Sequence, residues 1–294
     1  MGMTVFLNIK NFKYQKKLNT MAITAQEVNK LRQQTGAGMM DCKKALEENN
    51  GDFEKAIDYL RKKGAKVAAS RGDREAKEGV VLAKVSADGK TGIVISVNCE
   101  TDFVAKNSDF IAFAETVAGI ALDKKATTID EIKAASFNGD VTVNDKFMEQ
   151  VGKIGEKIDI GYYEAINAEK VVGYIHPGNR VSVVVGFNKD VADEVGRNVA
   201  MQAAAMAPVA LDKDGVTQDM LNRELEIAKE QIRAEGKPED MVEKIAQGKI
   251  SKFYKESTLL NQEYIKDSKL NVLQYLQSVD KGLTATAFKR YSLS

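Results

Sequence analysis

The sequence predicts an α+β protein with a small N-terminal helical module, a core that repeats a strand–turn–strand–helix pattern, and a projecting helical hairpin. Three observations support this prediction. Apolar residues near the N-terminus recur at helical spacing. Two strand-like pairs, each around a turn, are followed by helical runs. A long charged segment is helical on both sides of a Gly–Lys–Pro break. The 294 residues are enough for two or three modest domains.

The bulk composition limits the classes of function. Lys and Arg number 43 and Asp and Glu 42, so a dedicated nucleic-acid coat or membrane binder is not expected. Two distant cysteines, Cys42 and Cys99, and a single histidine, His176, leave few ways to build a metal site or a His-based dyad. We therefore expect a reduced, cytoplasmic chain with no metal and no cofactor, no membrane contact, and no direct contact with nucleic acid.

Residues 1–20 differ from the rest because they contain four lysines and no Asp or Glu. They lack the arginines of an organellar transit sequence and the apolar centre of a secretory signal. We interpret this segment as a disordered extension that adds nothing to the fold.

Residues 21–64 are predicted to form a module of three short helices. Thr24 and Glu27 have the spacing of a capping box, Gly36 and Gly38 break the first helix, and Gly64 is expected to end the third. Residues 65–77 follow as a basic linker, and the stretch 61–77, RKKGAKVAASRGDREAK, contains seven basic and two acidic residues. We favour a solvated linker over a contact with RNA, because no aromatic residues are interleaved with the charges.

The core is predicted from a pattern that occurs twice. The first copy, VVLAKVSADGKTGIVISV, precedes a helical run at 110–122, and the second, VVGYIHPGNRVSVVVGF, precedes one at 191–206. These copies define a core N-subdomain, 78–169, and a core C-subdomain, 170–210 and 258–294, which closes with the strand-like TATAFKRYSL. Residues 123–160 look helical. The repeated order indicates an ancient duplication.

The two copies differ where the second strand meets the helix. Three residues, 188–190, make this connection in the second copy, whereas 98–109 make it in the first. The longer connector contains Phe103 among polar residues. Since three residues suffice in the sister copy, we expect Phe103 to be exposed and functional, and Phe110 on the following helix to belong to the core.

Residues 211–257 are predicted to project as a helical hairpin. Gly236 can end one helix and Pro238 can begin the next. Apolar residues on both sides have the spacing of an antiparallel coiled coil, namely Met220, Leu221, Leu225, Ala228, Ile232, Met241, Ile245 and Ile250.

A search for catalytic motifs gives little. Gly36 and Gly38 lack the third glycine of a dinucleotide fingerprint, and no segment matches a phosphate-binding P-loop. The sequence therefore favours a protein that works by binding rather than by covalent chemistry. Two alternatives stay open: an RNA- or ribosome-associated helical protein that uses the basic linker, and an enzyme with an unrecognised site.

Three motifs point to a family. TGAGMMDCKKAL at 35–46, NCETDFVAKN at 98–107 and IHPGNRVSVVV at 175–185 occur in this order with helical connectors. Together they resemble the bacterial-type translation elongation factor Ts family, over residues 21–277. The resemblance implies a ubiquitin-associated-like N-terminal module and a coiled coil that some members use for self-association. It also implies guanine nucleotide exchange on elongation factor Tu, by displacement of Mg²⁺ and loosening of the phosphate site.

The resemblance further implies a set of partner contacts. The GTPase domain of elongation factor Tu would meet Asp102 and Phe103, with Thr101 and Val104 beside them. The remaining implied contacts are Arg32, Met39, Met40, Ile154, His176 and Ile265, and a second domain of elongation factor Tu is implied to take part beside its GTPase domain. One methionine of the pair could equally pack in the core. The best-known members carry a further C-terminal helical module, which we do not expect here.

Overall fold

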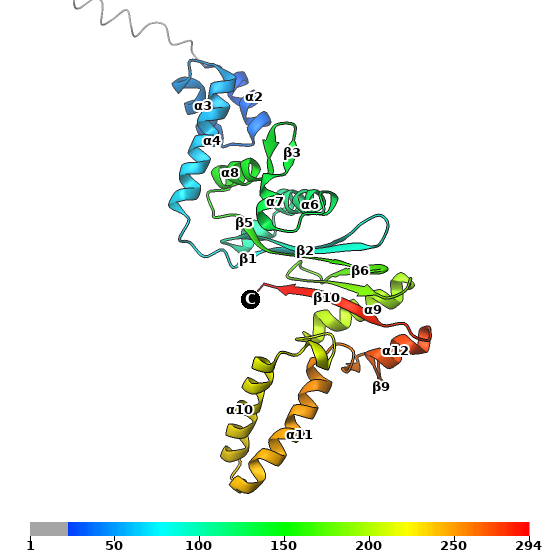
Figure 1. Cartoon of the computed structure of the whole chain (residues 1–294). Helices are drawn as coiled ribbons and strands as arrows, with labels where there is room; N and C mark the ends of the chain where they lie inside the picture. Colours follow the sequence, from blue (N-terminus) through cyan, green and yellow to red (C-terminus); the bar gives the residue numbers. More distant parts are fainter. Residues whose placement is uncertain (1–22, 294) are drawn as a thin grey trace, which may run out of the picture. The chain divides into compact units, whose positions relative to one another are not determined.

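The computed structural model describes residues 23–293, in two units (Figure 1). Of these residues, the first unit comprises 23–76 and 136–158, and the second comprises 77–135 and 159–293. The extension expected at residues 1–20 lies outside the described residues. The finer division into domains stays a prediction.

The first unit begins with the three expected helices, α2 (Ala25–Thr35), α3 (Met39–Glu48) and α4 (Phe53–Ser70). The Thr24–Glu27 capping box is present, and Gly36 ends α2 in the left-handed conformation with φ 66°. A small apolar core of six buried side chains holds the helices together, namely Val28, Leu31, Cys42, Ala45, Leu46 and Ala56.

The expectation that Gly64 ends the third helix is wrong, because α4 continues to Ser70. Gly64 instead allows a close approach to α8 (Val143–Ile154), since a Cβ on Gly64 would lie 2.4 Å from the carbonyl oxygen of Met148. A Cβ on Gly152 would likewise lie 2.9 Å from the Cα of Gly64. Residues 65–70 of the expected linker are therefore helical. Helix α8 packs on α4.

The expectation of helix throughout 123–160 is also wrong. A short helix, α7 (Ile129–Ala134), is followed by two short paired strands, β3 (Ser136–Asn138) and β4 (Val141–Thr142). Gly139, with φ 55°, allows the tight turn between them. After α8 the chain enters a further strand, β5 (Asp159–Asn167).

The second unit contains both predicted hairpins. In the first copy, β1 (Glu78–Val85) pairs with β2 (Thr91–Cys99), and α6 (Ser108–Asp123) follows. In the second, β6 (Lys170–Ile175) pairs with β7 (Val181–Phe187), and α9 (Asp193–Met206) follows. Each hairpin gains a third antiparallel strand beside its second strand, β5 in the first copy and β10 (Ala285–Ser292) in the other.

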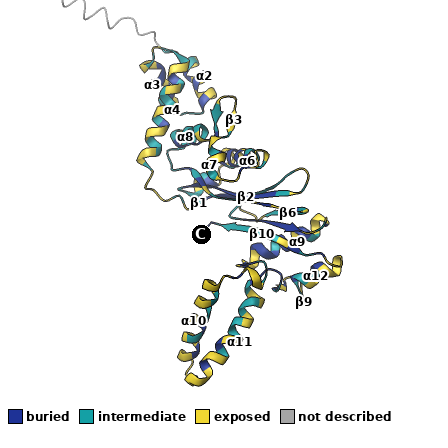
Figure 2. Cartoon of the chain, viewed as in Figure 1, coloured by how far each residue is buried: buried dark blue, intermediate teal, exposed yellow. Residues whose placement is uncertain are grey.

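The two sheets pack against each other, which explains why their strands are apolar on both faces. Val81 and Val94 of the first sheet share one buried cluster with Val171 and Val184 of the second. The opposite face of the second sheet packs on α9. Figure 2 shows buried residues concentrated in these strands.

The hairpin turns support the interpretation of a duplication. The backbone N–H of Val171 donates to the carbonyl of Gly89 at 2.6 Å, and the N–H of Val81 donates to the carbonyl of Asn179 at 2.7 Å. Each turn therefore accepts a hydrogen bond from the first strand of the other hairpin. Such a reciprocal exchange is expected of two related halves.

The remaining helices extend from the second copy. Helices α10 (Gln218–Ala234) and α11 (Glu239–Ser257) pack through Ala228, Ile232, Val242 and Ala246 and are otherwise largely exposed (Figure 2). They form a helical hairpin as expected, and its designation as a coiled coil stays a prediction. The chain returns through β8 (Glu263–Tyr264), β9 (Asp267–Asn271) and α12 (Val272–Val279) to β10.

Candidate protein-binding surfaces

The connector that contains Phe103 is more ordered than the sequence suggested. It includes a four-residue helix, α5 (Asp102–Ala105), which Thr101 caps by accepting a hydrogen bond from the N–H of Val104 at 3.4 Å. Ala105 is buried, whereas the side chain of Phe103 is 84% exposed. The expectation that Phe103 is exposed is confirmed. Helix α5 therefore packs against the protein through Ala105, while the side chain of Phe103 stays in water.

Charge surrounds this aromatic side chain. The ammonium of Lys106 lies 2.6 Å from the carboxylate of Asp102, one helical turn away. The hydrogen bond from Lys106 holds the pKa of the Asp102 carboxyl below its ordinary value. Asp102 is therefore ionised at neutral pH and keeps the surface beside Phe103 hydrated.

The second predicted contact, His176, lies at the same end of the sheet as α5. Glu78, at the start of β1, is paired in register with Cys99, the residue that leads into α5. Glu78 also forms an ion pair with Arg180, in the β6–β7 turn next to His176. The structure thus brings the α5 connector and the His176 turn to the two sides of one strand end.

The ring of His176 is exposed, but its orientation is restrained. The hydroxyl of Tyr174 lies 3.0 Å from Nδ1 of His176, and the two rings meet edge to face with centroids 6.0 Å apart. The guanidinium of Arg197 covers the Tyr174 ring at 5.9 Å. A hydrogen bond at Nδ1 leaves Nε2 directed away from Tyr174, where a partner group can reach it.

Ile265 lies at the tip of the β8–β9 turn, and its side chain is 47% exposed. Nearly half of this apolar side chain therefore stays in water on a two-residue turn. Its exposure agrees with the predicted role as a contact.

The first unit carries the remaining predicted contacts. Met39 and Met40 begin α3 and are 52% and 75% exposed, so the interpretation that one of them packs in the core is wrong. Arg32 is exposed at the end of α2, and Ile154 is half-buried at the end of α8. All four therefore belong to one unit.

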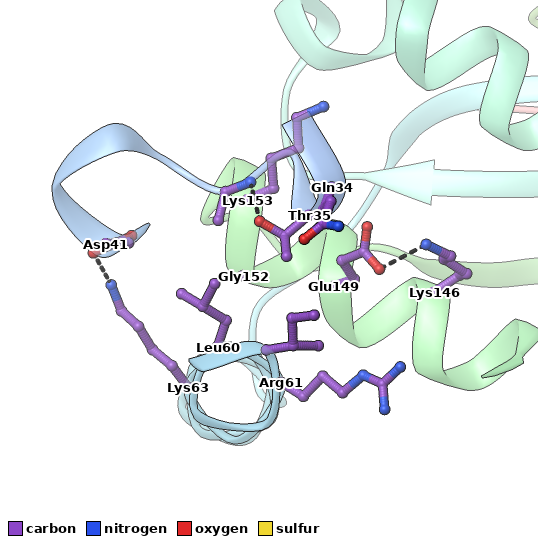
Figure 3. Close-up of a pocket in the computed structure, with 12 residues that line it drawn as sticks. Gln34, Thr35, Asp41, Leu60, Arg61, Lys63, Lys146, Glu149, Gly152 and Lys153 are labelled. Carbon is purple, nitrogen blue, oxygen red and sulfur yellow. Dashed lines mark hydrogen bonds and ion pairs between the residues drawn. The ribbon is translucent and has the colours of Figure 1, made fainter. Parts of the chain in front are cut away.

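Sequence reasoning missed a cavity of about 160 Å³ in the first unit, between α4, α8 and the α2–α3 connection (Figure 3). Its floor includes Leu60, and the Asp41–Lys63 ion pair borders it on one side. The Lys146–Glu149 pair, at 2.7 Å, borders the other side. The cavity depends on the packing of α8 against α4, a contact between segments far apart in the chain that no local sequence pattern marks.

Between residues 23 and 293, His, Cys, Asp and Glu side chains form no group of three placed to hold a metal ion. None of the helices in that range has the length and apolar character that a membrane span requires. Cys42 and Cys99 are both buried and form no disulfide, and burial raises the pKa of Cys42.

The chemistry of these surfaces is that of recognition. Phe103, Met40 and Ile265 expose apolar area from positions that local hydrogen bonds or helix geometry fix. Exposed apolar side chains with polar neighbours are typical of surfaces that bind other proteins. The fold and these surfaces together therefore define a protein that works by binding another protein.

Comparison with known proteins identifies the family. The family model described as "Elongation factor TS" matches residues 100–294. Elongation factor Ts of Christiangramia forsetii is 54% identical over 273 residues, which cover 92% of this chain and 98% of that protein. The protein of the same name from Flavobacterium psychrophilum is 52% identical over 273 residues, with the same shares covered. That of Porphyromonas gingivalis is 47% identical over 274 residues, which cover 93% of this chain and 99% of that protein. The chain belongs to the elongation factor Ts family.

Proposed function

We propose that this protein is a guanine nucleotide exchange factor that binds elongation factor Tu and promotes release of GDP during translation elongation, in the cytoplasm. Membership of the elongation factor Ts family supports the partner and the process. The exposure of Phe103 on the capped helix α5 is the observation that carries the mechanism. The protein acts by binding, without covalent chemistry.

The mechanism follows from linkage. A factor that binds the nucleotide-free partner more tightly than the loaded partner must weaken nucleotide binding by the same ratio. Burial of one phenylalanine side chain supplies about 1.5–3 kcal/mol. If the pocket for Phe103 opens only when the partner's Mg²⁺-side loops shift, this free energy displaces the ion and loosens the phosphates.

The predicted contacts divide between the units. In the second unit, Thr101, Asp102, Phe103, Val104 and His176 would contact the GTPase domain. In the first unit, Arg32, Met39, Met40 and Ile154 would contact the same domain. Ile265, also in the second unit, would be a further contact with elongation factor Tu.

The helical hairpin provides a surface for self-association. Met220, Ile227 and Met241 are each about 40% exposed on α10 and α11, so residues 211–257 retain apolar area that a second copy would cover. We propose a homodimer through this hairpin.

The test of the proposed function is release of fluorescently labelled GDP from elongation factor Tu. The protein should accelerate release strongly at micromolar concentration, and Phe103→Ala should remove most of that acceleration. Val279→Ala removes an exposed apolar side chain at the end of α12 that belongs to none of the predicted contacts, so it is the control and should leave the maximal rate unchanged. No acceleration by the wild-type protein would reject the proposal.

A second candidate function is contact with RNA. The observation that favours it is a groove of about 650 Å³ on α3 and α4, lined by Lys44, Lys62, Lys63, Lys66, Tyr59 and Val67 among others. Binding through these lysines would weaken steeply as salt rises. Fluorescence anisotropy with a labelled RNA between 50 and 200 mM salt would detect it, and Lys62→Glu with Lys66→Glu should abolish it.

A further inference from the structure

Two glutamine side chains are buried where α9 meets the segment after α11: Gln202 lies on α9, and Gln262 follows α11. Gln202 is 0% exposed and Gln262 is 1% exposed. Burying an amide costs free energy unless its polar atoms are hydrogen-bonded. These amides therefore hold their place only because of the groups that they bind.

The amide of Gln202 binds the turn that carries Ile265. Its Oε1 accepts a hydrogen bond from the backbone N–H of Ile265 at 2.9 Å. Its Nε2 donates to the carbonyl of Glu263 at 3.1 Å and to Oε1 of Gln262 at 3.2 Å. One side chain of α9 therefore forms hydrogen bonds to the backbone on both sides of Tyr264, at Glu263 and at Ile265.

The amide of Gln262 extends the network to two helix ends. Its Nε2 donates to the carbonyl of Glu256 at 2.9 Å and to that of Met206 at 3.3 Å. Glu256 lies in the last turn of α11, and Met206 is the last residue of α9. The Ile265 turn is thus connected through two amides to the base of the helical hairpin.

A second tether acts one helical turn away. Asn198 precedes Gln202 by four residues on α9, so both project from one face. Oδ1 of Asn198 accepts a hydrogen bond from the ammonium of Lys266 at 2.7 Å, and its Nδ2 donates to the hydroxyl of Tyr275 at 3.2 Å. The two residues of the turn, Ile265 and Lys266, are therefore each held by a separate side chain of α9.

The turn needs such support, because β8 has only two residues and its register with β9 is irregular. So short a strand pair has little stability of its own. An apolar side chain in place of Gln202 would fill the same volume but would leave the N–H of Ile265 without its acceptor. The buried amide fixes the direction in which Ile265 points.

We propose that Gln202 is a positioning residue for partner binding: with Gln262, it holds the β8–β9 turn so that Ile265 meets the partner in one orientation. This inference rests on the proposed function. A loose turn would have to become ordered when the partner binds, and this ordering costs free energy. Because the turn is already ordered in the folded protein, binding does not carry that cost.

The first experiment requires no partner. Hydrogen exchange at the Ile265 amide, followed by NMR, should be slow in the wild-type protein. In Gln202→Met, which keeps the size of the side chain and removes its amide, exchange at Ile265 should be at least tenfold faster than in the wild type. Val199→Ala, at a fully buried position on the same helix, is the control for general destabilisation and should leave Ile265 protected relative to its neighbours. Continued protection in Gln202→Met would overturn the inference.

The second experiment is a double-mutant cycle on GDP release from elongation factor Tu. Ile265→Ala and Gln202→Met should each raise the half-saturating concentration of the exchange factor roughly threefold to tenfold, with the maximal rate unchanged. If Gln202 acts through Ile265, the double variant should be no worse than the weaker-binding single variant.

The outcomes separate the two hypotheses. Multiplied effects in the double variant, or an unchanged half-saturating concentration in Gln202→Met, would reject the positioning role while leaving the exchange function intact. A wild-type protein that fails to accelerate GDP release would reject the proposed function and this inference with it.

Discussion

The two halves of the second unit share one topology and differ in one connector. In each half a hairpin leads to a helix, a further segment follows, and a third strand returns beside the second strand of the hairpin. In the first half that further segment passes through residues 136–158, which belong to the first unit and include α8, and in the second half it forms the helical hairpin. The sheets and their helices, α6 and α9, are therefore common to both halves. The segments that differ lie between this helix and the third strand of each half.

The connectors between second strand and helix have opposite roles. In the second half, the side chain of Asn188 accepts from the N–H of Thr284 and donates to the carbonyl of Gly282, both at 2.9 Å, while Lys189 pairs with Asp280 at 2.9 Å. This connector uses its polar groups to hold the entry to β10. The connector of the first half caps its own helix and leaves Phe103 exposed. One connector therefore stabilises the entry to β10, whereas the other leaves a large apolar side chain in water.

The largest expected effect concerns Phe110, the buried counterpart of Phe103. Phe110 is 1% exposed on α6, so Phe110→Ala should lower the free energy of unfolding by about 3–5 kcal/mol. Urea unfolding followed by circular dichroism measures this loss, since the chain contains no tryptophan. A loss below about 1 kcal/mol would show that α6 is not part of the common scaffold.

The next effect concerns Phe103 itself. Phe103→Ala should leave the urea midpoint close to that of the wild type, because the ring is already in water. It should slow stimulated GDP release roughly fivefold to a hundredfold, which corresponds to the loss of about 1–3 kcal/mol at a central contact. The opposite pattern, unfolding with normal exchange by the folded fraction, would make Phe103 a structural residue and remove the distinction between the two connectors.

A smaller effect is expected from the sister half. His176→Ala should slow exchange roughly threefold to tenfold, since the imidazole is one exposed contact at the same strand end as Phe103. Tyr174→Phe keeps the ring and loses the hydroxyl that restrains Nδ1, so it should act in the same direction but less. If Tyr174→Phe slows exchange while His176→Ala does not, the histidine is not the contact.

The sequence predicted the repeated elements well, because hairpins with Gly-containing turns and amphipathic helices carry strong local patterns. It also predicted the exposure of Phe103, from the unequal lengths of the connectors. It could not predict α5, since four residues are too few for a helical period. It assigned Gly64 to a helix end because local pattern does not distinguish a glycine that stops a helix from one that admits a neighbouring helix. The Gln202–Ile265 contact joins residues far apart in sequence, and no local pattern marks it.

The smallest expected effect concerns Asp102, beside Phe103. The pKa of its carboxyl is lower in the folded protein than the ordinary value of 3.8, because of the hydrogen bond from Lys106. The charged pair therefore stabilises the folded state above the ordinary pKa, and this contribution is lost as the pH falls through the lower, folded-state pKa. Asp102→Asn should shift the urea midpoint slightly at pH 7 and not at all below the folded pKa. Both groups are largely hydrated, so screening by salt should diminish even the shift at pH 7.

In Asp102→Asn, exchange should slow only about twofold to fivefold, because a charge at the rim of an interface contributes less than a buried ring. A loss in Asp102→Asn as large as that in Phe103→Ala would show that the carboxylate, rather than the aromatic side chain, is the principal contact on this connector.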